Sequence, residues 1–75
     1  MGRGDSQRQR QEFGLRLQAL RHERGLTQEG LAERSGLHRT YIGQVEGGHR
    51  NVSLDAIHSL AIGLDLSPAR LFEHR

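Results

Sequence analysis

The chain has 75 residues, no cysteine and a formal net charge of +2 at pH 7. A chain of this length forms one small domain that buries only about 60% of its unfolded surface, and without cysteine it cannot be stabilised by disulfides. No apolar run is long enough to cross a membrane, and the polar N-terminus lacks the apolar stretch of a secretory signal. We therefore expect a cytoplasmic protein without a membrane partner.

The cationic side chains are distributed unevenly along the chain. All 11 are arginines, and six of them fall within the first 24 residues. The planar guanidinium group suits phosphates and guanine edges, but a GC-rich genome also favours arginine over lysine. Composition alone therefore leaves a nucleic-acid partner open.

Apolar residues recur at helical spacing along most of the chain, and no segment alternates with the period of a strand. Residues 1–10 are polar and aperiodic, which predicts a flexible arginine-rich tail ahead of one domain at 11–75. The tail is either a solvated segment or an arm that places arginines in a minor groove. A first helix follows, with one apolar stripe made of Phe13, Leu17 and Leu20. Gly25 ends this helix as a left-handed cap.

The next two helices are separated by a tight turn. Thr27 is a good N-cap for a helix over about 28–34. Gly36 supplies the positive φ that a turn at Ser35–Leu37 requires. A third helix is expected over about 39–46.

The last part of the chain predicts two further helices. Ser53 caps a fourth helix, and its inner stripe is expected to consist of Leu54, Ile57, Ala61 and Leu64. Asp65 turns the chain, and Ser67-Pro68 starts a short fifth helix that ends at Leu71–Phe72. The sequence thus predicts a compact all-α fold of five helices.

The third helix has two chemically different faces. At about 100° per residue, Ile42 and Val45 point towards the core. The opposite face carries Arg39, Thr40, Gly43 and Gln44. Arginine and glutamine pair bidentately with guanine and adenine in the major groove. Because any exposed helix face is polar, this helix alone leaves base readout and a solvated face equally open.

The stretch from Leu17 to Phe72, with the run GLTQEGLAERSGLHRTYIGQVEGGHRNVSLDAIHSLAIGLDLSPARLF, resembles the lambda-repressor and Cro-like (XRE) helix-turn-helix family. The signature positions are Gln28, Ala32, Gly36, Ile42, Glu46 and Gly48. Within the family, the run RTYI…VE.G.RNVSL looks most like the controller proteins of restriction-modification systems. The resemblance implies a lambda-repressor-like fold and a transcriptional regulator that binds a palindromic double-stranded DNA operator as a homodimer. RNA polymerase is a further candidate partner.

The resemblance also implies roles for individual residues. The base-reading positions are Arg39, Thr40 and Gln44, with Arg50 serving a base or a phosphate. The phosphate positions are Gln28, Tyr41, Asn51 and Ser53. Arg21 and Glu46 match an ion pair that ties the first helix to the third. The candidate dimer surface is formed by Leu66, Leu71 and Phe72, for which core packing is the alternative. His38 stands where a short capping residue is commoner. An ordinary exposed histidine is the favoured interpretation, and the alternatives are a poor cap or a phosphate contact made when the ring is protonated.

Functions other than that of a controller are compatible with the same sequence features. The same fold serves as an antitoxin or general repressor of another operon, and some helix-turn-helix domains are protein-binding modules. No nucleophile elbow or glycine-rich phosphate loop supports an enzyme. The histidines lack metal-ligand spacing: His22, His38, His49, His58 and His74. We therefore expect no metal, no cofactor and no small-molecule ligand.

Overall fold

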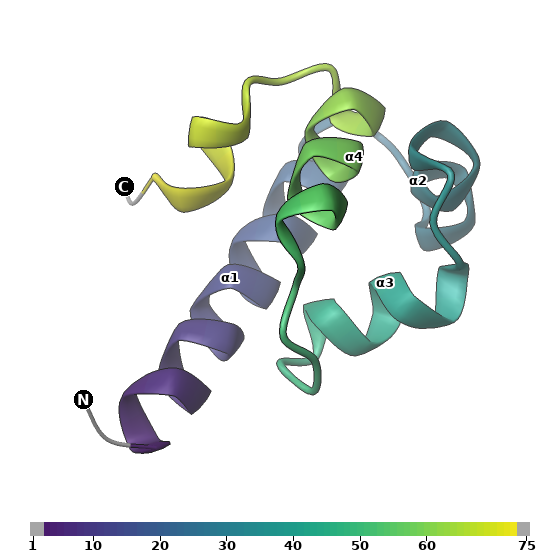
Figure 1. Ribbon diagram of the computed structural model, residues 1–75. Helices are drawn as coiled ribbons and strands as arrows, with labels where there is room; N and C mark the ends of the chain where they lie inside the picture. Colours follow the sequence, from purple (N-terminus) through teal and green to yellow (C-terminus); the bar gives the residue numbers. More distant parts are fainter. Residues whose placement is uncertain (1–2, 74–75) are drawn as a thin grey trace.

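A computed structural model describes the backbone of residues 3–73 and the side chains of residues 6–73. The predicted position of His74 and the first two residues of the predicted tail lie outside this part of the chain. The elements are four α-helices and one 3-10 helix: α1 (Arg3–Glu23), α2 (Gln28–Ser35), α3 (Arg39–Glu46), α4 (Leu54–Leu64) and η1 (Pro68–Phe72) (Figure 1). No strand occurs within residues 3–73, so the prediction of an all-α helix-turn-helix fold is confirmed.

The helix boundaries follow from local capping. Thr27 caps α2, its hydroxyl accepting a hydrogen bond from the backbone N–H of Gly30 at 2.9 Å. Ser53 caps α4 by accepting one from the backbone N–H of Ala56 at 3.1 Å. His38 precedes α3 without a side-chain capping bond. The caps predicted at Thr27 and Ser53 are confirmed, and the absence of a capping bond at His38 agrees with one of the alternatives given for it.

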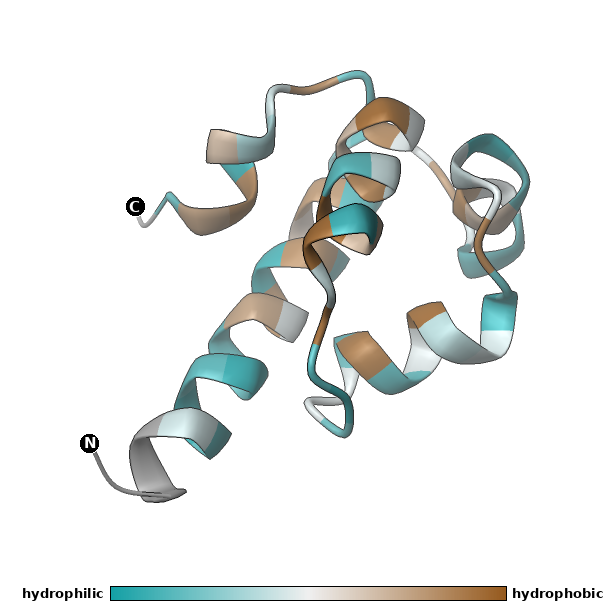
Figure 2. Ribbon diagram, viewed as in Figure 1, coloured by the Kyte–Doolittle hydropathy of each residue, from teal (hydrophilic) through white to brown (hydrophobic). Residues whose placement is uncertain are grey.

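The helices pack around one apolar core. Its fully buried side chains come from every element: Leu17, Leu20, Leu31, Ile42, Val45, Leu60, Leu64 and Leu71. α2 packs on α4, α3 packs on α1, and η1 contacts both α1 and α4. Figure 2 shows hydrophobic residues in the second half of α1 and along α4, and hydrophilic residues in the coloured turns that precede the second half of α1. No helix within residues 3–73 is long and apolar enough to cross a membrane.

The start of the chain differs from the prediction of a flexible tail at residues 1–10. α1 begins at Arg3 and continues without interruption through these residues. Its early turns lie against the α3–α4 loop, where a Cβ added to Gly48 would lie 2.8 Å from Cγ of Gln11. Arg10 also donates a hydrogen bond to Asn51 at 3.3 Å. The loop thus contacts α1 at Arg10 and Gln11, and extending the helix through the neighbouring Gln and Arg residues costs little, because both are good helix formers.

Two predictions about the last elements are wrong. Leu54 is 69% exposed rather than part of the inner stripe of α4, because it is the first residue of the helix and no other element covers it. The fifth element is a 3-10 helix rather than an α-helix. It has five residues, which is little more than one turn, and short pieces of this kind commonly adopt i→i+3 hydrogen bonds.

Two glycines allow helices to approach closely. A Cβ on Gly14 would lie 2.5 Å from the carbonyl oxygen of Glu46, so α1 and α3 can pack at this distance only without a side chain there. A Cβ on Gly63 would lie 3.1 Å from Cβ of Ser35. Arg34 reinforces this contact between α2 and α4 by donating to the carbonyl of Gly63 at 2.6 Å.

Candidate nucleic-acid interface

The outer face of α3 is presented to solvent as the helical period predicts. Ile42 and Val45 are buried, whereas Arg39, Thr40 and Gln44 are exposed. α3 follows α2 after a turn in which Gly36 has a φ of 76°. The two helices thus form a helix-turn-helix whose second helix has a free polar face.

A buried ion pair sets the position of α3. Nε and Nη2 of Arg21 donate to the two carboxylate oxygens of Glu46 at 2.6 and 3.0 Å. Nη1 of Arg21 donates to the carbonyl of Leu26 at 2.9 Å. The side-chain Nε2 of Gln28 donates to Oε1 of the same Glu46 carboxylate at 3.0 Å. The network joins α1, the start of α2 and the end of α3, so it fixes the angle at which α3 is presented.

The predicted pair of Arg21 and Glu46 is therefore present in the structure. A buried ion pair is weak evidence of net stability, because desolvating both charges offsets their attraction. The pair nevertheless restrains the position of α3, because both carboxylate oxygens of Glu46 accept hydrogen bonds from Arg21. All three guanidinium nitrogens of Arg21 donate hydrogen bonds, the third one to the carbonyl of Leu26. The side-chain amide of Gln28 donates to the same carboxylate, so this hydrogen bond joins the start of α2 to the end of α3.

The loop after α3 folds back over its outer face. Nε of Arg50 donates to Oε1 of Gln44 at 2.9 Å, and the Arg50 guanidinium carbon lies 5.3 Å from the centroid of the Tyr41 ring. The cation–π contact and the hydrogen bond together restrict a long side chain that is otherwise exposed. Arg50 thereby becomes part of the α3 surface, although it lies outside the helix.

Six of the predicted DNA-binding residues surround one hollow of about 720 Å³, here called the α3 hollow. They are Thr40, Tyr41, Gln44, Arg50, Asn51 and Ser53. Two predicted residues do not line it. Arg39 lies beside a neighbouring hollow with Glu29 and Glu33, and Gln28 is hydrogen-bonded to Glu46.

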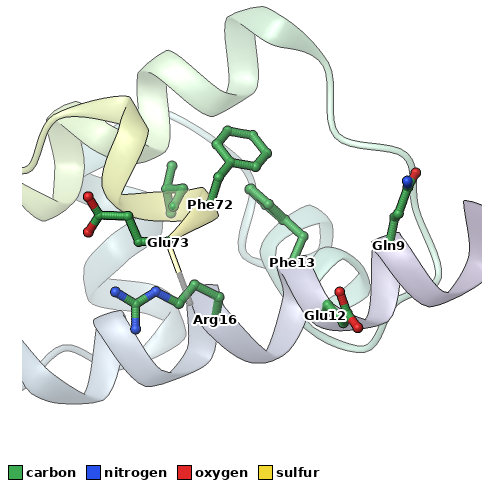
Figure 3. A pocket seen from close by; sticks show the side chains of 7 residues that line it. Gln9, Glu12, Phe13, Arg16, Phe72 and Glu73 are labelled. Carbon is green, nitrogen blue, oxygen red and sulfur yellow. The ribbon is translucent and has the colours of Figure 1, made fainter. Parts of the chain in front are cut away.

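The predicted dimer residues differ in exposure. Leu71 is only 1% exposed, so its prediction as a surface contact is wrong: its side chain fills the protomer's own core. Phe72 is 56% exposed. Its ring also packs against Phe13, with the ring centroids 5.3 Å apart, beside a hollow of about 330 Å³ (Figure 3). Leu66 is half-buried against the core.

Sequence reasoning missed Arg10 as part of this surface. Its hydrogen bond to Asn51 joins two residues that are 41 positions apart. The only local indication of this contact was the position of Arg10 in the helical repeat of α1, which places it on the same face as Gly14, Leu17 and Arg21. That signal was hidden by the assignment of residues 1–10 to a tail.

Comparison with known proteins agrees with this geometry. The helix-turn-helix domain family matches residues 12–73. The restriction-modification controller protein C.AhdI from Aeromonas hydrophila is 53% identical, with coverage of 85% of this chain and 97% of that chain and a TM-score of 0.84. The wild-type controller protein C.Esp1396I is 33% identical, with coverage of 84% and 83% and a TM-score of 0.78.

A regulator of a different kind of gene is also similar. The clp gene regulator ClgR from C. glutamicum is 30% identical, with coverage of 84% of this chain and 82% of that chain and a TM-score of 0.78. No curated protein sequence matches the chain.

Proposed function

Because this chain belongs to the lambda-repressor-like (XRE) helix-turn-helix family of DNA-binding transcriptional regulators, we propose that it is the controller of a restriction-modification operon and binds a palindromic operator as a homodimer. The observation that carries this proposal is the outer face of α3, held in place by the Arg21–Glu46 pair and extended by Arg50. The 53% identity to C.AhdI, over 97% of that controller, supports the type of operon.

In the proposed complex α3 lies in the major groove. Arg39, Thr40 and Gln44 read base edges, and Arg50 adds a guanidinium group that contacts a base or a phosphate. Phosphate contacts come from the rim of the same surface, through Gln28, Tyr41, Asn51 and Ser53. These contacts supply most of the affinity, and the base contacts supply the specificity.

The proposed dimer places two copies of α3 on one face of the duplex. Half-sites for such dimers are spaced about 34–36 Å apart, or one helical turn. Phe72 and Leu66 are the proposed contacts between protomers, since they leave apolar surface uncovered at the C-terminal end. RNA polymerase is a proposed further partner once the operator is occupied.

An affinity selection from random duplex DNA tests this proposal. We expect a palindromic sequence to be enriched and bound at least about 10³-fold more tightly than random duplex. Enrichment of no sequence, with binding that only weakens as salt rises, would contradict the proposal, since counterion release alone behaves in this way. In that case the protein-binding alternative gains support.

A second candidate function is regulation of another operon, which the similarity to ClgR favours. The enriched sequence separates the two functions when it is searched for in the source genome. A match upstream of restriction and methyltransferase genes supports the controller. A match upstream of unrelated genes supports the general regulator.

A further inference from the structure

A smaller hollow of about 280 Å³, here called the α1–loop hollow, lies between the first turns of α1 and the loop that joins α3 to α4. Its polar lining is formed by Ser6, Gln9, Arg10, Arg50 and Asn51, and its other described lining residues are apolar. None of its described lining residues carries a carboxylate. Two guanidinium groups with amide and hydroxyl donors, and no acid among them, form a lining that suits an anion.

The hydrogen bond from Arg10 to Asn51 determines which atoms this lining offers. Nη1 of Arg10 donates to Oδ1 of Asn51 at 3.3 Å. This bond occupies the carbonyl oxygen of the Asn51 amide and leaves its NH₂ group as a donor, together with the other N–H groups of Arg10. Arg50 is constrained in the same way, because its Nε donates to Gln44 and its Nη groups stay available.

The α1–loop hollow is continuous with the surface that faces DNA in the proposed complex. Arg50 and Asn51 line both this hollow and the α3 hollow. Ser6, Gln9 and Arg10 precede residues 12–73, which match the family, so the family match assigns them no role. We propose that the α1–loop hollow binds a backbone phosphate of the operator, with Arg10 as an additional DNA contact and Asn51 oriented by it.

This inference rests on the proposed function, because it needs a duplex seated on α3. The contact lies at the edge of the protein surface and carries no base information, so it adds affinity on any sequence. It extends the footprint of each protomer beyond the reading helix and its loop. The ligand is a phosphodiester group held by charge and by directed hydrogen bonds.

Arg10→Ala tests the site, with Arg8→Ala as the matched control. Both changes remove one arginine from α1, but the two positions differ by about 200° around the helix, and Arg8 is exposed. DNA affinity is measured against salt concentration, on the selected operator and on random duplex. For Arg10→Ala we expect the slope of log K against log salt to become shallower by about 0.9 per protomer bound. Arg8→Ala should leave the slope unchanged.

Further variants separate a phosphate contact from a structural effect. Arg10→Lys keeps the positive charge and should leave the slope of log K against log salt unchanged. The DNA affinity of this variant should fall, because lysine cannot donate two parallel hydrogen bonds to a phosphate as a guanidinium group does. If Asn51 is oriented by Arg10, the loss of affinity in the Arg10→Ala/Asn51→Ala double variant should be smaller than the product of the two single losses. Unfolding midpoints of all variants are compared, so that a loss of fold is recognised.

Three results would overturn the site. Equal changes of slope in Arg8→Ala and Arg10→Ala would mean that only overall charge matters. A weaker affinity of Arg10→Ala with an unchanged slope would mean that Arg10 only supports the loop. Inorganic phosphate that binds at Arg10 without DNA, together with an unchanged DNA slope, would identify a free-anion site instead. Failure of the wild-type chain to select an operator would contradict the proposed function, whereas the comparison on random duplex still tests Arg10.

Discussion

The carboxylate of Glu46 is bound by two nitrogens of Arg21, at 2.6 and 3.0 Å, with both side chains buried. Glu46 is the last residue of α3, and Arg21 lies near the end of α1. The pair therefore connects the reading helix to the longest helix of the domain. The chain uses a charge pair in its interior to orient the surface that we propose to bind DNA.

Removing one partner of this pair should be more damaging than removing both. Glu46→Ala leaves Arg21 buried without its carboxylate, which costs about 3–5 kcal/mol. That cost is close to the stability of a domain of this size, so circular dichroism should show a largely unfolded chain at 25 °C. Arg21→Met combined with Glu46→Leu buries no charge and should stay folded. Similar unfolding of the single and the double variant would contradict this account of the pair.

Two glycines within helices should respond to alanine in opposite directions. Gly14→Ala places a Cβ 2.5 Å from the carbonyl oxygen of Glu46, and we expect the free energy of unfolding to fall by about 1–3 kcal/mol. At Gly43 the nearest atom is a side-chain oxygen of Gln28 at 3.5 Å. Gly43→Ala should therefore raise stability by about 0.5–1 kcal/mol through helix propensity. Urea denaturation measures both, and stabilisation by Gly14→Ala would contradict the close packing of α1 on α3.

Substitution of Arg39 should change which DNA sequences are bound. Arg39→Ala is expected to cost about 1–3 kcal/mol on the selected operator and to relax specificity at one base position. Asn51→Ala serves as the comparison, since loss of a phosphate contact weakens binding to all sequences alike. Binding is measured on the operator and on single-base variants of it. A uniform loss for Arg39→Ala would show that Arg39 contacts only a phosphate.

Tyr41 should contribute to operator binding in two separable ways, through its hydroxyl and through its ring. Tyr41→Phe removes the hydroxyl proposed to contact a phosphate but keeps the ring under Arg50. Tyr41→Ala also removes the cation–π contact, and operator binding should weaken by about a further 0.5–1 kcal/mol. In an Arg50→Ala background the two Tyr41 variants should bind equally. A difference that persists there would mean that the ring acts independently of Arg50.

The exposed ring of Phe72 should strengthen the proposed dimer. Phe72→Ala is expected to raise the dissociation constant of the dimer at least about tenfold, because the interface loses one well-packed apolar side chain. Leu15→Ala is the control, because Leu15 is 63% exposed and points away from Phe13 around α1. Sedimentation equilibrium measures the association, and thermal unfolding at high concentration checks the fold. Unchanged association would place the dimer surface elsewhere.

Local chemistry in the sequence determined the helix-turn-helix itself. Thr27, Gly36 and Ser53 specify ends of helices through short-range hydrogen bonds and a positive φ, and these signals act within three or four residues. The 3.6-residue period likewise placed Ile42 and Val45 inward and Gln44 outward. Such features need no knowledge of the rest of the chain.

Only the tertiary structure decided which surfaces are covered and which distant residues meet. Periodicity assigned Leu54 to an inner face, and the family resemblance assigned Leu71 to a partner surface. Coverage depends on what packs above each position, and Leu54 is exposed whereas Leu71 is buried. The contacts of Arg10 with Asn51 and of Arg50 with Tyr41 and Gln44 arise because residues of the α3–α4 loop reach both α1 and α3. α1 is helical from Arg3 onward, where the local pattern predicted a tail, and the same loop contacts it at Arg10 and Gln11. Tertiary contacts can stabilise a helical segment that lacks an amphipathic period.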